Sequence, residues 1–189
     1  MRLGDIPLSE LKDSHLTSAM ENGDDINMIM YSAATLGNLD ICKSLIGSID
    51  DINMVLSHAA WGGQLEICKY LVSQGASEFN LALSGAAKSG NLALCKYLVN
   101  MGADMYDLPL MGAVEGDHLE LCEYFVNKGA GQNKDYLTFQ LKSASLRTLK
   151  CIILNCPIEG NIELNKVKTK FFIQTTGDIG HLKINNTIF

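Results

Sequence analysis

Ala86–Asp104 reads AAKSGNLALCKYLVNMGAD, and closely similar stretches occur three more times in this chain of 189 residues. The alanine that opens each copy stands at 33, 59, 86 and 113, so the copies follow one another at steps of 26, 27 and 27 residues. Such a period is typical of solenoids, in which each unit buries its apolar face only against its neighbours. We therefore expect a helical repeat protein, and we look for its function on its surface.

Each copy predicts two short helices. In the third copy the first helix covers Leu81–Ser89, and its small residues Ala86 and Ala87 permit a close approach of neighbouring helices. The second helix covers Leu92–Asn100, where apolar residues recur with helical periodicity. Glycines are expected to end the helices, and a polar residue six positions before the first alanine is expected to cap each first helix. The expected caps are Asn27, Asn53, Asn80 and Asp107.

These motifs resemble the ankyrin repeat. Pro109-Leu110 followed by Ala113 is similar to the family's P-L-x-x-A, and Gly102–Asp104 to its terminal G-A-D. The stretch Lys69–Ala76 is similar to ankyrin proteins of amoeba-infecting giant viruses. The family period is about 33 residues, so the shorter period here leaves little room for the family's β-hairpin. The resemblance implies an all-α, ankyrin-type solenoid of stacked helix-turn-helix repeats, with the β-hairpin fingers shortened or absent.

Three segments are expected along the chain. Residues 1–26 are predicted to form an N-terminal capping helix, 27–131 four ankyrin-like repeats, and 132–189 degenerate repeats and a C-terminal cap. The capping helix is predicted over Ser9–Asn22, with Ser9 as its N-cap. Its residues Leu11, Leu16, Ala19 and Met20 are expected to face the repeats. Gly180–Ile184 suggests a sixth, truncated unit, whereas Lys170–Thr175 fits a β-strand equally well.

No motif in the sequence indicates catalysis or a cofactor. The chain has no H-E-x-x-H, Walker loop, G-x-G-x-x-G or C-x-x-C motif. Stacked helices lie about 8–10 Å apart and a disulfide needs Cα atoms within about 7 Å, so the four cysteines at one repeat position are expected to be core residues. The carboxylate pairs Asp24-Asp25 and Asp50-Asp51 precede first helices, so capping is a better reading than metal binding. We expect a non-enzyme with no catalytic, cofactor-binding or metal-binding residues.

Charge and hydropathy suggest an intracellular protein. Met1–His15 has no apolar run of signal-peptide type, and nowhere do eighteen apolar residues follow one another. We therefore expect no membrane contact and a cytoplasmic location, in a host cell if the protein is viral. Residues 1–140 carry a net charge of -10 and residues 141–189 a net charge of +4. This asymmetry allows attraction between the ends of neighbouring molecules, although drift on solvated surfaces also explains it.

The family resemblance implies that a partner protein docks on the concave face. Trp61 is the only tryptophan in the chain, and Thr, Lys and Glu replace it in the other copies. It is therefore either an interface anchor or a cover over Ala86-Ala87 of the next repeat. A second possible surface is the tyrosine stripe formed by Tyr70, Tyr97 and Tyr124 on the second helices. The predicted partner-binding residues are Thr35, Leu36, His58, Trp61, Lys88, Ser89 and Glu115, with Glu78 and Met105 in the turns.

Three functions follow from these observations. The first is a non-enzymatic scaffold or adaptor that binds a protein of unknown identity, with no small-molecule substrate. The second is an assembly protein that self-associates through its acidic repeats and basic C-terminal segment. The third is a nucleic-acid binder, which the net charge of the repeats makes unlikely. It would use Lys142, Arg147, Lys150, Lys166, Lys168 and Lys170.

Overall fold

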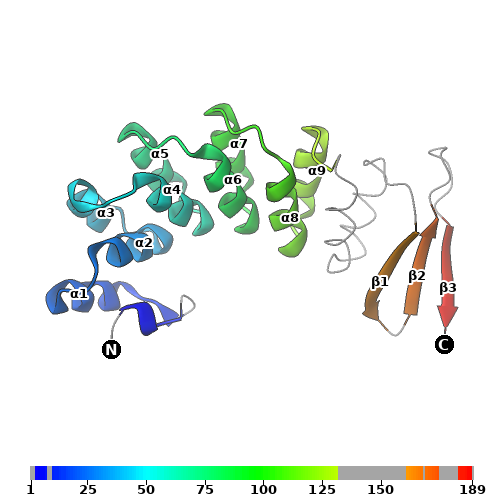
Figure 1. The fold of residues 1–189 in the computed structure, drawn as a ribbon, viewed down its shortest axis with the longest axis horizontal. Helices are drawn as coiled ribbons and strands as arrows, with labels where there is room; N and C mark the ends of the chain where they lie inside the picture. The colour runs from blue at the N-terminus through cyan, green and yellow to red at the C-terminus, as the bar shows by residue number, and fades with distance from the viewer. Residues whose placement is uncertain (1–2, 8–9, 132–160, 168, 175–182, 189) are drawn as a thin grey trace. The chain divides into compact units, whose positions relative to one another are not determined.

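A computed structural model of the chain describes residues 3–7, 10–131, 161–167, 169–174 and 183–188. The chain divides into two compact units, residues 1–104 and residues 105–189 (Figure 1). The first unit contains η1 (Leu3–Asp5), α1 (Asp13–Asn22), α2 (Ile26–Leu36), α3 (Leu39–Leu45), η3 (Ile46–Ser48), α4 (Ile52–Trp61), α5 (Leu65–Ser73), α6 (Phe79–Lys88) and α7 (Leu92–Asn100). The predicted paired helices are therefore present.

The first helices of the pairs, α2, α4 and α6, pack against one another in sequence order, and each packs against the second helix of its own pair (Figure 1). The alanine pairs in the middle of these first helices are completely buried. A Cβ atom added at Gly62 would lie 2.2 Å from the carbonyl oxygen of Thr35, and one at Gly85 would lie 3.0 Å from the backbone nitrogen of Trp61. Small residues thus allow the close helix approach that the sequence predicts.

The expected N-caps of the first helices are wrong. Asp25 and Asp51 cap α2 and α4, and the carboxylate of each accepts from the backbone N–H groups two and three residues further on. Glu78 is the N-cap of α6 without a side-chain cap bond. α2 and α4 begin earlier than predicted because the carboxylates of Asp25 and Asp51 reach the first free N–H groups. Asn27 and Asn53 therefore lie inside the first turn.

The N-terminal helix is shorter than predicted. α1 begins at Asp13 instead of Ser9, with Lys12 as its N-cap, and the backbone N–H of Lys12 donates to Nδ1 of His15 at 3.2 Å. Ser9 itself lies outside the described residues. Leu11, Leu16 and Ala19 are buried as expected, whereas Met20 is 44% exposed and does not face the repeats. α1 packs on α2. It is therefore the apolar neighbour that precedes α2 in the stack of helices.

The described residues of the second unit form one helix pair and a β-sheet. α8 (Asp107–Glu115) packs against α9 (Leu119–Asn127). β1 (Asn161–Val167), β2 (Thr169–Gln174) and β3 (Lys183–Ile188) form an antiparallel sheet in the order β1-β2-β3. The all-α class is therefore wrong for residues 161–167, 169–174 and 183–188, which are strands, in agreement with the strand alternative. Of the expected sixth unit, residues 180–182 lie outside the described residues, and Lys183 and Ile184 belong to β3. The β-branched and aromatic residues of β2 favour extended backbone.

The turns between the helix pairs contain no strand in the described residues 10–131. The predicted loss of the β-hairpin fingers is thus confirmed there. Cys42, Cys68, Cys95 and Cys122 are buried free thiols, as expected for core residues. Burial raises the pKa of Cys42 to about 11 and those of Cys68 and Cys95 to about 12, so these thiols are poor nucleophiles. Residues 132–160, the first part of the predicted degenerate repeats, lie outside the described residues.

Candidate partner-binding face

An asparagine in the first turn of each of α2, α4 and α6 hydrogen-bonds the turn that follows its helix pair. Oδ1 of Asn53 accepts from the backbone N–H groups of Ser77 and Glu78 at 2.8 and 3.1 Å. Asn27 bonds Asp50 twice: its Oδ1 accepts from the Asp50 N–H at 3.1 Å, and its Nδ2 donates to the Asp50 carboxylate at 2.7 Å. These bonds join residues 23 to 25 positions apart. They align successive first helices at one end, which places their exposed side chains in rows.

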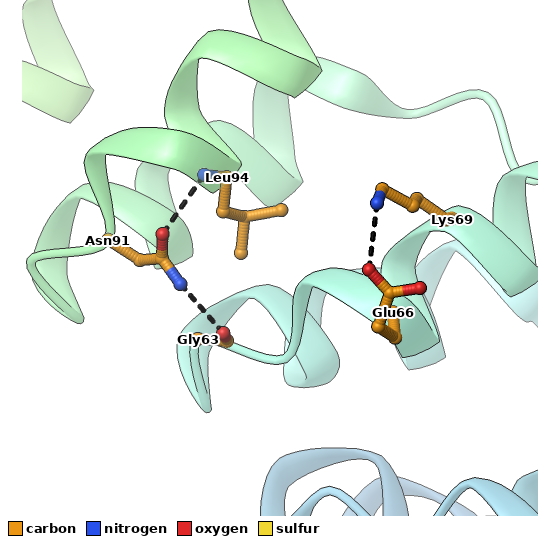
Figure 2. A network of polar contacts seen from close by, with 5 residues as sticks. All are labelled: Gly63, Glu66, Lys69, Asn91 and Leu94. Atoms are coloured by element: carbon orange, nitrogen blue, oxygen red, sulfur yellow. Dashed lines mark hydrogen bonds and ion pairs between the residues drawn. The ribbon is translucent and has the colours of Figure 1, made fainter.

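The other end of each first helix is held by a polar residue that precedes the second helix. Figure 2 shows Asn91, whose Oδ1 accepts from the Leu94 N–H at 3.0 Å and whose Nδ2 donates to the Gly63 carbonyl at 2.8 Å. Gln64 occupies the same repeat position and donates to the Thr35 carbonyl at 3.1 Å. The side chains at this position are structural, because they bond backbone groups of the preceding repeat.

The same view shows an ion pair on the second helix α5. Nζ of Lys69 lies 2.7 Å from Oε1 of Glu66, one helical turn away (Figure 2). Both side chains are well exposed, so the pair adds little to stability. It marks a solvated surface rather than a binding site.

Trp61 is exposed on the first-helix side of the first unit. Its exposed fraction is 39%, although the helix that it ends, α4, packs on α2, α5 and α6. Lys88, which follows it at the same repeat position in α6, is exposed as well. Thr35 precedes it in α2 and is half-buried, and its Oγ1 donates to the carbonyls of Tyr31 and His58 at 2.9 and 3.3 Å. The Thr35 hydroxyl thus binds backbone groups of α2 and α4, and we regard it as a structural group of this face rather than a contact for a partner.

His58 lies in a ring stack with Tyr31 that joins α2 and α4. The ring centroids are 4.7 Å apart and the planes differ by 9°. Burial lowers the pKa of His58, so the imidazole is neutral at pH 7. Burial, with smaller effects from Asp51, Asp50 and Asp25, raises the pKa of Tyr31. Both rings are half-buried, so His58 contributes an aromatic surface rather than a charge.

The remaining predicted residues fall into three groups. Glu78 is exposed in the turn before α6. Leu36 and Ser89 are half-buried, and the Ser89 hydroxyl donates to the Ala86 carbonyl at 2.8 Å. Glu115 and Met105 are exposed but belong to the second unit. The candidate face is therefore built from the first unit alone.

Sequence reasoning missed an apolar row on this face. Met28, Met54 and Leu81 stand five residues before the first alanine of their repeats, and they are 42%, 39% and 47% exposed. We call these three residues the apolar row. The recurrence of a large apolar residue at one repeat position was visible in the sequence, but its exposure depends on how the helices stack. Exposed apolar side chains at equivalent positions indicate a binding surface.

The tyrosine stripe is a weaker candidate. Tyr70 and Tyr97 are half-buried on second helices, and Nζ of Lys43 lies 6.0 Å from the Tyr70 ring centroid. Burial raises the pKa of Tyr97, to which the neighbouring Cys68 also contributes. These rings lie where neighbouring second helices contact each other, as α3 and α5 do. They therefore act mainly as packing residues.

Among the described residues, no group of three His, Cys, Asp or Glu side chains is placed to hold a metal ion. In the same part of the chain, each helix is too short or too polar to cross a membrane. Asp25 and Asp51 act as helix caps, in agreement with the structural role expected for the carboxylate pairs. In comparisons with known proteins, neither a family model nor a curated protein matches this chain.

Proposed function

We propose that this chain is a non-enzymatic, ankyrin-type repeat protein that binds a partner protein on its first-helix face. The observation that carries the proposal is the exposure of Trp61 at the end of α4, together with that of three apolar side chains at equivalent repeat positions near the starts of α2, α4 and α6. Tryptophan is enriched among residues that dominate binding energy, and hydrogen bonds at both ends of the first helices hold this face in place. A preorganised face loses little conformational entropy on binding.

The proposal is tested by capturing partners with three forms of the full chain: wild type, Trp61→Ala and Met101→Ala. Met101 is a matched control because it is also 39% exposed but lies at the end of the second helix α7. A protein retained by wild type and Met101→Ala, and lost with Trp61→Ala, is the expected result. Trp61→Ala should change the free energy of unfolding by no more than about 1 kcal/mol. Equal retention by all three forms would contradict the proposal.

Self-association is the second candidate, and the charge distribution of the sequence favours it. The net charge is -6 for residues 1–104 and +4 for residues 141–189. Attraction between these segments of neighbouring molecules would be screened by salt. Sedimentation should then show oligomers at low ionic strength that dissociate at high ionic strength, and a monomer at low salt and high concentration would exclude this function.

A further inference from the structure

Charge is unevenly distributed over the repeats of the first unit. Six of the twelve acidic residues in residues 1–104 lie in the turns that precede first helices. The four lysines after residue 40 stand on second helices or at the end of α6, although Asp40 and Glu66 also lie on second helices. The turn segments 23–25, 47–51, 74–78 and 101–104 contain no lysine or arginine. Asp25, Asp51, Glu78 and Asp104 are all exposed there, and we call them the acidic row. Lys43, Lys69 and Lys96 occupy one exposed position of α3, α5 and α7.

The acidic row runs beside the apolar row. The Asp25 carboxylate accepts from the backbone N–H of Met28 at 3.4 Å, and the Asp51 carboxylate accepts from that of Met54 at the same distance. Glu78 likewise stands three residues before Leu81, at the start of α6. Each repeat of the first unit thus presents one carboxylate and one exposed apolar side chain within a single helical turn. The pairing recurs at each step along the first helices.

We infer that the partner segment on this face is a basic amphipathic peptide, with apolar side chains on Met28, Met54 and Leu81 and lysine or arginine side chains on the acidic row. This inference rests on the proposed function and names the chemistry of its partner. Apolar groups gain free energy by covering the apolar row, and cations gain by approaching three or four carboxylates of like sign. Nucleic acid and anionic membranes would be repelled by the same carboxylates.

The distance between neighbouring repeats also predicts how the apolar residues of the peptide are spaced. Neighbouring packed helices lie about 8–10 Å apart. Side chains seven residues apart on an α-helix are separated by about 10.5 Å, and side chains three residues apart on a polyproline II segment, which share one face, by about 9.3 Å. The apolar residues of the peptide should therefore recur every seven or every three positions, with basic residues between them.

The test uses a displayed library of random 16-residue peptides, selected on the full chain. Selected peptides are then synthesised with a fluorescent label, and their binding is followed by the anisotropy of that label, which serves equally for wild type and for Trp61→Ala. The variant Asp25→Asn/Asp51→Asn/Glu78→Gln removes three charges of the acidic row. Asparagine caps helices about as well as aspartate, so this variant should fold. The matched control is Glu21→Gln/Asp40→Asn/Glu66→Gln, which removes three exposed charges from α1, α3 and α5.

The inference predicts that the selected peptides are rich in lysine and arginine and carry apolar residues at the spacing given above. Their Kd should rise about ten-fold in the acidic-row variant, since each exposed charge pair contributes modestly, and should change less than about two-fold in the control. Raising the salt from about 50 to about 500 mM should weaken binding to wild type.

Two other results would overturn the inference in distinguishable ways. Peptides that need Trp61 but lack basic residues, and bind equally well to the acidic-row variant, would contradict the basic partner and leave the proposed function standing. Selected peptides that bind Trp61→Ala as well as wild type would contradict both, because the first-helix face would then not be the binding surface.

Discussion

Asn80 and Asp104 hydrogen-bond each other twice. The Asn80 Nδ2 donates to the Asp104 carboxylate at 3.0 Å, and the Asn80 Oδ1 accepts from the Asp104 backbone N–H at 2.9 Å. Asn27 forms the same pair of bonds with Asp50. The side chain that the sequence suggests as a local helix cap thus acts over 24 residues, from the start of one helix pair to the turn that follows the same pair. It restrains the end of each repeat that carries the acidic row.

Replacement of Asn53 should destabilise the first unit. Asn53→Ala removes the acceptor for the Ser77 and Glu78 N–H groups, so the free energy of unfolding should fall by about 1–2 kcal/mol. Urea denaturation followed by circular dichroism measures this change. Asn100→Ala is the control, since Asn100 is exposed at the end of α7, and it should stay within about 0.5 kcal/mol of wild type. Equal stability of both variants would exclude the cross-repeat role.

Alanine should act in opposite directions at two glycines. At Gly62 the added Cβ would lie 2.2 Å from the Thr35 carbonyl oxygen. This oxygen belongs to the backbone and can move only together with the helix, so we expect the free energy of unfolding to fall by about 2 kcal/mol or more. At Gly47 nothing lies within 4 Å, and Gly47→Ala should be neutral or stabilise by up to about 1 kcal/mol. Thermal unfolding of the two variants checks this contrast. A harmless Gly62→Ala would mean that α2 and α4 are not in close contact.

The buried thiols predict a loss of stability in alkali. Burial raises the pKa of Cys95 from its ordinary value of 9.0 to about 12. Between these values the unfolded thiol loses its proton while the folded one keeps it, so the free energy of unfolding falls as pH rises. One thiol contributes at most about 1.4 kcal/mol per pH unit. Urea titrations between pH 8 and 10.5 should therefore show a shallower decline for Cys95→Ala than for wild type. Parallel curves would contradict the raised pKa.

Local signals in the sequence predicted the second helices well. Leu92–Asn100 is the predicted second helix of the third copy and the observed α7, because its apolar spacing and its capping residue act within one or two turns. The predicted starts of the first helices lie one or two residues after the observed starts. Asp25 and Asn27 are both good caps locally, and the choice between them depends on Asp50, a partner of Asn27 23 residues away.

The candidate face was predicted only in part. Trp61 was singled out because no other repeat needs an aromatic residue there, and its exposure is consistent with that interpretation. The apolar row was missed, since an apolar residue at a constant repeat position is usually a core residue. Thr35 and Ser89 look like surface positions in the sequence, but their hydroxyls are engaged in bonds to backbone carbonyls.

The sequence by itself determined the repeat period, the paired helices and the buried cysteine position, because periodicity, small residues and glycines act through short-range sterics and amphipathic burial. Only the tertiary structure decided which polar side chains join neighbouring repeats and which apolar ones stay exposed. Asn53 bonds a turn 24 and 25 residues away, and Met54 remains 39% exposed beside the Asp51 cap. Both outcomes depend on how far one helix pair is shifted and rotated against the next, and that packing arises only when the repeats stack.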